Sequence, residues 1–262
     1  MRLKDKVAVI TGAGSGIGKA MAHRFAAEGA KVVCASISGR AVDVAAEIGD
    51  AAVGVQADVA EEADVRRMIA TAEEAFGRID VLVNNAGFGG KLLPLHEQTT
   101  ETWDRVHDVN LRGVFFCMKY GIIAMRGTGG GSIVNISSAT AMVGFKHHGL
   151  YGAAKAGVNQ MTKAAALDYA DDHIRVNAVC PGTIWTGLVP ASKESAAPPP
   201  GVRRLPGIPM DRWGLSDEIA SAALFLASDE SSYVTGILMP VDGGYSIGYS
   251  GLGAEKTGRS TA

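Results

Sequence analysis

The stretch VAVITGAGSGIG, residues 7–18, predicts the fold more clearly than any other part of the sequence. The apolar run Val7–Ile10 is typical of a buried strand, and it leads directly into a glycine-rich turn. Beyond the turn, Ile17, Met21 and Phe25 recur every four residues, which is the spacing of one face of an α-helix. The segment therefore predicts a strand, a tight turn and a helix in immediate succession.

Three glycines of this turn, Gly12, Gly16 and Gly18, follow the pattern G-x-x-x-G-x-G. Glycines allow the backbone to approach a pyrophosphate closely, and the N-terminus of the following helix offers unpaired N–H groups and a partial positive charge. A tight turn that binds nothing is the alternative interpretation. We expect the turn to border a nucleotide-binding crevice.

Outward from this segment, six further apolar runs alternate with helical patterns. The runs are nearly continuous in apolar residues, as expected for strands that helices cover on both faces. The alternation favours an α/β fold, a Rossmann-type doubly wound seven-stranded parallel sheet flanked by helices, in a single domain over residues 1–246. The further strands are expected at Lys31–Ala35, Ala52–Gln56, Val81–Val83, Ser132–Ile136, Arg175–Val179 and Ile237–Val241. The further helices are expected at residues 65–76, Trp103–Met125, Gly152–Tyr169 and Asp217–Ala227.

The composition argues against several classes of protein. The chain has 262 residues, of which 47% are hydrophobic, and a formal net charge of -2. Such a chain can bury a large core and lacks the basic character typical of proteins that bind nucleic acid. No apolar run approaches the roughly 20 residues that span a bilayer, and the N-terminus has no signal-peptide pattern. We expect no nucleic-acid partner, no membrane partner and a cytoplasmic location.

The cysteines and histidines do not indicate a metal site. Cys34, Cys117 and Cys180 are widely separated and lie in apolar segments, which favours reduced thiols in the core over a disulfide. The histidines do not follow the spacing of metal ligands, so we expect no catalytic metal.

Two segments interrupt the alternation of strands and helices. Residues 187–210 are rich in Pro, Ala and Gly and follow a strand end, so we expect a flap over a cleft, with a passive surface loop as the alternative. Residues 247–262 are rich in Gly and Ser and predict a loosely ordered C-terminal tail.

The ends of the second and third strands carry candidates for nucleotide contacts. Ser36 stands roughly 20 residues beyond the glycine turn, where an acidic residue would bind the adenosine ribose of NAD and reject a 2′-phosphate. Because Ser36 is not acidic and Ser38 and Arg40 are near it, the sequence slightly favours NADP(H), and NAD(H) stays open. Asp58 and Val59 follow the third strand. The Asp58 carboxylate is expected either to accept a hydrogen bond from the adenine amino group or to cap the next helix.

Tyr151 and Lys155 are four residues apart at the start of a predicted helix, so both side chains project from one face. Ser137 and Ser138 end the fifth strand, at the edge where open α/β sheets bind ligands. A tyrosine must lose about three units of pKa, or about 4 kcal/mol, to act as a base near neutrality. In a sheltered cleft, the ammonium of Lys155 and a positively charged nicotinamide could together lower the pKa of Tyr151 by this amount. An exposed helical pair is the alternative.

Several motifs occur together in an order and spacing that resembles the classical short-chain dehydrogenase/reductase family. They are TGAGSGIG (11–18), NNAG (84–87), Asn110 within a helix, NISS (135–138), YGAAK (151–155), PGTIWT (181–186) and VDGG (241–244). The resemblance covers residues 4–246. It implies an NAD(P)-dependent oxidoreductase that transfers a hydride, on the B-face of nicotinamide, to or from a secondary alcohol or ketone.

The resemblance also implies a role for each matched residue. Tyr151 would be the acid/base, and Ser138 would polarise the substrate oxygen. Lys155 would hold the nicotinamide ribose and lower the pKa of Tyr151. Asn110 would anchor a water that links Lys155 to solvent, and an asparagine is otherwise a poor choice inside a helix. The implied cofactor-binding residues are Gly12, Ser15, Gly16, Ile17, Gly18, Ser36, Asp58, Val59, Asn85, Ala86, Gly87, Tyr151, Lys155, Pro181, Gly182, Ile184 and Thr186.

The sequence does not identify the substrate. Residues that could line its pocket, with plain packing as the alternative for each, are Phe88, Thr140, Met142, Phe145, His148, Trp185 and Leu188. The nearest alternative activity is a 3-oxoacyl-thioester reductase acting on acyl carrier protein, for which Arg203, Arg204 and Arg212 are the basic candidates. A non-catalytic dinucleotide sensor is disfavoured, because Tyr151, Lys155, Ser138 and Asn110 are all present.

The family resemblance implies a homotetramer. The apolar faces of Trp103–Met125 and Gly152–Tyr169 are candidates for contact between subunits, and Ile237–Val241 would lie near a second interface. The alternative is that these faces only cover the sheet.

Overall fold

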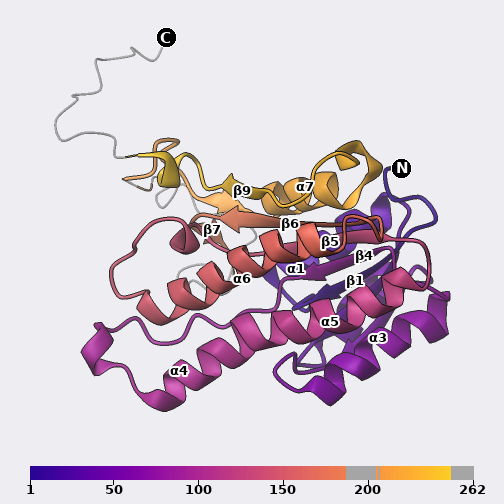
Figure 1. Cartoon of the computed structure of the whole chain (residues 1–262), viewed down its shortest axis with the longest axis horizontal. Helices are drawn as coiled ribbons and strands as arrows, with labels where there is room; N and C mark the ends of the chain where they lie inside the picture. The colour runs from indigo at the N-terminus through magenta and orange to yellow at the C-terminus, as the bar shows by residue number, and fades with distance from the viewer. Residues whose placement is uncertain (187–204, 206, 249–262) are drawn as a thin grey trace, which may run out of the picture.

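The computed structural model describes residues 1–186, 205 and 207–248 as a seven-stranded parallel sheet between layers of helices (Figure 1). The strand order is β3-β2-β1-β4-β5-β6-β9, and every neighbouring pair is parallel. The predicted Rossmann-type, doubly wound sheet is therefore confirmed. The strands of the sheet are β1 (Val7–Thr11), β2 (Lys31–Ser36), β3 (Ala52–Gln56), β4 (Val81–Asn84), β5 (Gly131–Ile136), β6 (Ile174–Pro181) and β9 (Leu238–Val241).

Helices cover both faces of the sheet, and Figure 1 looks onto the layer formed by α3, α5 and α6. That layer consists of α3 (Glu62–Phe76), α5 (Gly113–Arg126) and α6 (Gly149–Asp168), with α4 (Thr100–His107) packed against α6. The opposite layer consists of α1 (Gly16–Ala27), α2 (Arg40–Ile48) and α7 (Ser216–Ala227). The short helix α2 is an element that the sequence analysis did not single out.

The central strand β1 shows how its sequence supports both layers. Successive side chains of a strand point to opposite faces of the sheet. Val7 and Val9 belong to the core under α3, α5 and α6, whereas Ala8 and Ile10 belong to the core under α1, α2 and α7. The continuous apolar run that predicted this strand is therefore the result of burial on both faces.

The single helix predicted over Trp103–Met125 is wrong in one respect, because α4 and α5 are separated by a π-helical turn over Asp108–Arg112. The cause lies in Asn110, whose Nδ2 donates to the carbonyl oxygen of Val106 at 2.8 Å. This side chain satisfies an oxygen that an α-helix would pair with the backbone, and the turn widens. Such π-helical turns often occur at functional sites.

Several smaller elements complete the described chain. β7 (Ile184–Trp185) and β8 (Gly214–Leu215) form a separate two-stranded parallel sheet. Four 3-10 turns lie at Leu95–Glu97, Ala139–Ala141, Asp229–Ser231 and Tyr245–Ile247. Most of the predicted flap, residues 187–204 and 206, and residues 249–262 of the predicted tail lie outside the described residues.

The three cysteines are free and buried, as predicted, and burial raises the pKa of each thiol. Among the described residues, the structure has no helix with the length and apolar character needed to cross a membrane.

Candidate active site

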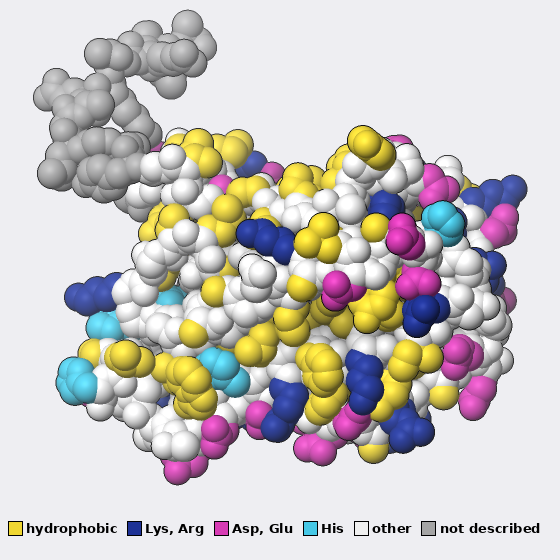
Figure 2. Space-filling model, viewed as in Figure 1, with side chains coloured by type: hydrophobic (Ala, Val, Ile, Leu, Met, Phe, Trp, Pro, Cys, Tyr) yellow, Lys and Arg dark blue, Asp and Glu magenta, His cyan; other side chains and the backbone are white. Residues whose placement is uncertain are grey.

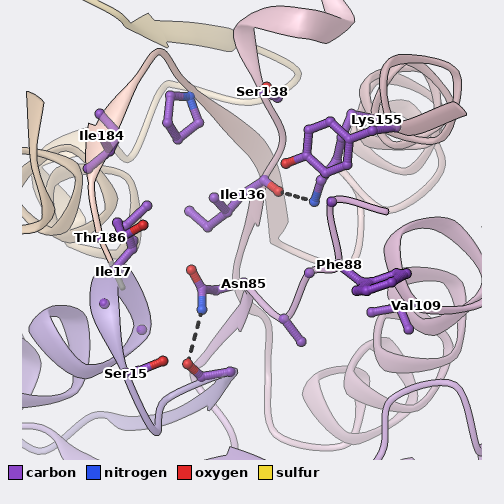
Figure 3. A pocket seen from close by; sticks show the side chains of 18 of the residues that line it. Ser15, Ile17, Asn85, Phe88, Val109, Ile136, Ser138, Lys155, Ile184 and Thr186 are labelled. Carbon is purple, nitrogen blue, oxygen red and sulfur yellow. Dashed lines mark hydrogen bonds between the residues drawn. The ribbon is translucent and has the colours of Figure 1, made fainter. Parts of the chain in front are cut away.

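A pocket of about 570 Å³ lies at the carboxyl edge of the sheet, where the strand order reverses between β1 and β4. Open α/β sheets bind ligands at such switch points. Figure 3 shows Ser15 and Ile17 on one side of this pocket and Ser138 and Lys155 on the other. All the cofactor-binding residues implied by the sequence line it: Gly12, Ser15, Gly16, Ile17, Gly18, Ser36, Asp58, Val59, Asn85, Ala86, Gly87, Tyr151, Lys155, Pro181, Gly182, Ile184 and Thr186.

The glycine-rich turn between β1 and α1 is held in place by two side chains. The hydroxyl oxygen of Thr11 accepts hydrogen bonds from the backbone N–H groups of Asn85 and Ala86, at 2.9 and 3.0 Å. In return, Asn85 Nδ2 donates to the Thr11 carbonyl oxygen at 2.9 Å. A Cβ atom on Gly18 would lie 2.2 Å from the Gly12 carbonyl oxygen, so only glycine fits there. The turn presents bare backbone to the pocket, which suits a pyrophosphate.

The end of β2 contains a small polar cluster. Ser36 Oγ donates to the Ser38 carbonyl oxygen at 2.6 Å, and Arg40 Nε donates to Ser38 Oγ at 3.3 Å. Ser36 therefore has its hydroxyl hydrogen engaged and can only accept further hydrogen bonds. The Ser38 hydroxyl hydrogen and the outer N–H groups of Arg40 remain as donors toward the pocket, which both residues line.

Asp58, just after β3, is held by contacts on both carboxylate oxygens. Oδ1 accepts the backbone N–H of Ala60 at 3.0 Å, and Oδ2 accepts Arg105 Nη2 from α4 at 3.1 Å. The N-cap of α3 is Glu61, so the alternative in which Asp58 caps this helix is wrong. Arg105 also lines the pocket, and the sequence analysis did not find it.

Ser138 and Tyr151 line the same wall of the pocket, close enough for the Ser138 hydroxyl to act on the pKa of Tyr151. Ser138 Oγ accepts the backbone N–H of Thr140 at 3.2 Å, which fixes the position of the hydroxyl. Burial raises the pKa of Tyr151 to about 12, and the nearby Ser138 hydroxyl acts in the opposite direction. Desolvation therefore dominates the pKa of Tyr151 here, and its lowering by Lys155 together with a bound nicotinamide stays a prediction.

Lys155 lies beneath the Tyr151 ring, with Nζ 5.7 Å from the ring centroid. Its side chain is 2% exposed, and Nζ donates to the Ile136 carbonyl oxygen at 2.8 Å (Figure 3). Burial lowers the pKa of Lys155 to about 8. Within the described part of the chain no carboxylate pairs with this ammonium, so a polar ligand in the pocket would meet a buried and weakly compensated donor.

Asn110 is fully buried and is not part of the pocket wall. Its Nδ2 donates to the Phe88 carbonyl oxygen at 2.7 Å, and its Oδ1 accepts the Phe88 N–H at 3.2 Å. A Cβ atom on Gly87 would lie 3.1 Å from Asn110 Oδ1 and 3.9 Å from Lys155 Nζ. The polar ends of Asn110 and Lys155 therefore both lie close to the Cβ position of the same glycine.

The residues predicted to line a substrate pocket divide into three groups. Phe88, Thr140, Phe145 and His148 line the pocket. Met142 and Trp185 do not, and buried Trp185 packs edge-on against Trp213 at 5.1 Å between ring centroids. Leu188 lies outside the described residues.

Two aromatic contacts reinforce this part of the pocket. Phe145 stacks on Tyr245 at 4.6 Å and meets His148 edge-on at 5.6 Å between ring centroids. Tyr245 comes from the C-terminal end of the described chain, and no local pattern connects it to Phe145. This end of the pocket is therefore bounded by an aromatic wall.

Comparisons with known proteins agree with the fold and with this arrangement. The sequence model of a family described as enoyl-(acyl carrier protein) reductase matches residues 12–246. The chain belongs to the classical short-chain dehydrogenase/reductase family.

Three relatives illustrate its place in that family. Cis-4-hydroxycyclohexanecarboxylate dehydrogenase of Sinomonas cyclohexanicum is 42% identical, over 92% of this chain and 96% of that protein. Cyclohexanol dehydrogenase of Acinetobacter sp. (strain SE19) is 40% identical, over 93% and 96%. The crystal structure of 3-ketoacyl-(acyl-carrier-protein) reductase from Brucella melitensis complexed with NADH is 40% identical, covers 93% of this chain and 99% of that one, and has a TM-score of 0.86.

Proposed function

We propose that this protein is an NAD(P)-dependent oxidoreductase that transfers a hydride between nicotinamide and a secondary alcohol or ketone. The observation that carries the proposal is one pocket with a glycine-rich turn at one end and the neighbouring side chains of Ser138 and Tyr151 at the other. The nicotinamide, when bound, supplies or accepts the hydride. The relatives named as dehydrogenases and reductases support this reading.

The proton is handled by Tyr151. Because Ser138 and Tyr151 are neighbours in one wall of the pocket, both can contact one substrate oxygen, with Ser138 fixing its position. A phenol whose pKa is about 12 is protonated at neutral pH and can donate its proton to an oxygen that becomes negative during reduction of a ketone. In the opposite direction the phenolate must form, and Lys155 is the nearby cation that favours it.

Lys155 and Asn110 act around this proton transfer. Nζ of Lys155 has the position and the donor capacity to hold ribose hydroxyls of the cofactor. Asn110 is proposed to anchor a water that passes a proton between Lys155 and solvent. This role is supported by the proximity of the two polar atoms. Asn110 Oδ1 and Lys155 Nζ both lie within 4 Å of the position that a Cβ atom on Gly87 would take.

The cofactor is proposed to be NADP(H) in preference to NAD(H). No carboxylate stands at the end of β2 to repel a 2′-phosphate, and the free donors of Ser38 and Arg40 can hold one. Ser36 itself, with its hydrogen engaged, contributes an acceptor for a ribose hydroxyl. The phosphate-binding part of the proposal therefore depends on Arg40 and Ser38.

The substrate is proposed to be a secondary alcohol on a six-membered ring, or the corresponding ketone. Two of the relatives are named for cyclohexanol and for a hydroxycyclohexanecarboxylate. In this chain, Phe145 and His148 line the pocket and Phe145 is stacked on Tyr245, so Phe145 offers a supported aromatic face against which such a ring can pack.

A 3-oxoacyl-thioester reductase is the second candidate, because one structural relative carries a name of this kind. Of the three basic residues that could bind an acyl carrier protein, Arg203 and Arg204 lie outside the described residues. Arg212 is engaged by the Glu218 carboxylate through two hydrogen bonds of 2.9 and 2.6 Å. The ion pair makes Arg212 a poor docking residue, which favours the first candidate.

The experiment is a turnover assay that follows nicotinamide absorbance with both cofactors. The substrates are cyclohexanol, cyclohexanone, an acyclic secondary alcohol and a 3-oxoacyl thioester. Turnover of the ring substrates by the wild type, and its loss in Tyr151→Phe with nucleotide binding retained, is the expected result. Reduction of the thioester alone would favour the second candidate, and no turnover together with no nucleotide binding would overturn the proposal.

We also propose that the protein is a homotetramer. Phe115 and Ile123 on α5 and Leu167 on α6 are 48%, 61% and 81% exposed, and Figure 2 shows hydrophobic side chains among charged ones over these two helices. A mass of four chains by light scattering is the expected result, and a monomer at micromolar concentration would contradict it. A cytoplasmic location stays a prediction from the sequence.

A further inference from the structure

The pocket contains an ion pair between Arg105 of α4 and Asp58 of the loop after β3. Arg105 Nη2 lies 3.1 Å from Asp58 Oδ2, and the side chains are 43% and 20% exposed. Both residues line the pocket, although they are 47 positions apart in the sequence. The pair therefore connects the α4 side of the pocket with the edge formed by β2 and β3.

Asp58 is held from three directions. One carboxylate oxygen accepts the Ala60 N–H at 3.0 Å, and the other accepts Arg105. The backbone N–H of Asp58 donates to Asp64 Oδ2 at 2.9 Å, and Asp64 is itself paired with Arg67 at 2.8 Å. Without Arg105, the carboxylate would be fixed through one oxygen only, and the last torsion of an aspartate is soft.

The position of Asp58 determines what its carboxylate can read. Residues from the ends of β2 and β3, among them Ser36, Ala57 and Asp58, line the same end of the pocket. On the proposed function, this end receives the adenosine half of the cofactor. Each carboxylate oxygen has a second lone pair, so Asp58 can still accept a hydrogen bond from an exocyclic amino group.

We propose that Arg105 is a positioning residue that orients the Asp58 carboxylate toward the amino group of adenine, so that the site discriminates adenine from hypoxanthine. Hypoxanthine has a carbonyl oxygen in place of the amino group, and this oxygen is repelled by a fixed carboxylate. A carboxylate freed from Arg105 can turn toward the neighbouring ring N–H of hypoxanthine. Loss of Arg105 therefore weakens the binding of adenine and improves that of hypoxanthine. This inference rests on the proposed function.

The test measures nucleotide binding without turnover, by the fluorescence of reduced nicotinamide. The probes are NADPH and NADH, each compared with the analogue that carries hypoxanthine in place of adenine. Arg105→Gln should weaken the adenine forms by about threefold to fivefold, as expected for a partly exposed ion pair. The hypoxanthine forms should bind as well as before or better, so the preference for adenine falls.

The matched control is Arg112→Gln. Arg112 is an exposed arginine in the π-helical turn that follows α4. It is paired with Asp108 at 2.7 Å, and it does not line the pocket. This control should leave both affinities unchanged. In an Asp58→Asn background, Arg105→Gln should have no further effect on base preference, because the two residues act through one contact.

Two outcomes would overturn the inference. If Arg105→Gln weakens adenine and hypoxanthine forms equally, Arg105 acts on the fold or on the net charge of the pocket. If it changes neither affinity, the ion pair has no part in binding. A wild-type protein that binds none of the four nucleotides would overturn the proposed function itself, which is a distinguishable result.

Discussion

Nζ of Lys155, on α6, donates a hydrogen bond to the carbonyl oxygen of Ile136, on β5, across a distance of 2.8 Å. The bond places a buried ammonium at the carboxyl edge of the sheet. Burial lowers the pKa of this lysine from 10.5 to about 8, so the folded state binds the proton less tightly than the unfolded state does. The site therefore contains a group that destabilises the fold when it is charged.

The first prediction concerns the pH dependence of this effect. Because the folded pKa is lowered, the contribution of Lys155 to stability is fully favourable only above the unfolded pKa and is lost as the pH falls through about 8. Relative to Lys155→Met, the wild type should gain about 2 kcal/mol of unfolding free energy between about pH 7 and about pH 9.5. Urea unfolding of both proteins at the two pH values measures this gain. Tyr151 and the cysteines are present in both proteins, so their own contributions to the pH dependence of stability cancel in the comparison. A stability difference between the two proteins that is the same at both pH values would contradict the prediction.

The second prediction concerns Gly18. A Cβ atom there would lie 2.2 Å from the Gly12 carbonyl oxygen and 2.6 Å from Asn85 Nδ2, so Gly18→Ala must displace the glycine-rich turn. We expect a loss of about 1–3 kcal/mol of stability and at least a tenfold weaker nucleotide affinity. Thermal unfolding and fluorescence titration measure the two effects. Gly144→Ala is the control, because nothing lies within 4 Å of its Cβ position. Equal behaviour of the two variants would show that the close approach has no consequence.

The third prediction concerns the choice of cofactor. Ser36→Asp places a carboxylate where a 2′-phosphate would lie, and Arg40→Gln removes a donor for it. Each change should lower the ratio of kcat/KM for NADPH to that for NADH by about tenfold. Steady-state kinetics with both cofactors measure the ratio. If neither variant changes it, the interpretation of the end of β2 is wrong.

The fourth prediction concerns Asn110. Its side chain makes three hydrogen bonds to the backbone, one to Val106 and two to Phe88, and it is completely buried. Asn110→Ala leaves these backbone groups unpaired and should destabilise the protein by about 2–4 kcal/mol, with a fall in kcat. Gln98→Ala removes another amide that binds backbone carbonyls in the same loop, but at a more exposed place, and should leave kcat unchanged. A change of less than about 1 kcal/mol for Asn110→Ala would contradict this reading.

The parts of the fold that the sequence predicts well are those that depend on local patterns. A strand buried on both faces appears as an unbroken apolar run, and for this reason the predicted strand Val7–Ile10 agrees with β1 to within one residue. Helix ends were also predictable where a glycine provides a left-handed cap, as Gly77 does with φ of 80° after α3. The predicted groups converge on one pocket because strand ends must meet at one edge of a parallel sheet.

The parts that were missed depend on contacts between distant residues. The π-helical turn arises from Asn110, whose amide bonds the Val106 carbonyl oxygen and also the backbone of Phe88, and nothing near position 110 indicates the contact with Phe88. Arg105 reaches Asp58 only because the fold places α4 beside the loop after β3, 47 positions away in the sequence. The raised pKa of Tyr151 was missed for a related reason, since the degree of burial follows from the packing of several elements around the phenol.

The bonds from Asn85 and Ala86 to Thr11 do more than join β1 to β4. They give the glycine-rich turn its final shape before any nucleotide arrives. A ligand that enters the crevice therefore has little conformational entropy to remove from this loop, and more of the contact energy appears as affinity. Thr11 does not line the pocket. A substitution at Thr11 is nevertheless expected to slow the association of the nucleotide, because the turn would have to reach its final shape during binding.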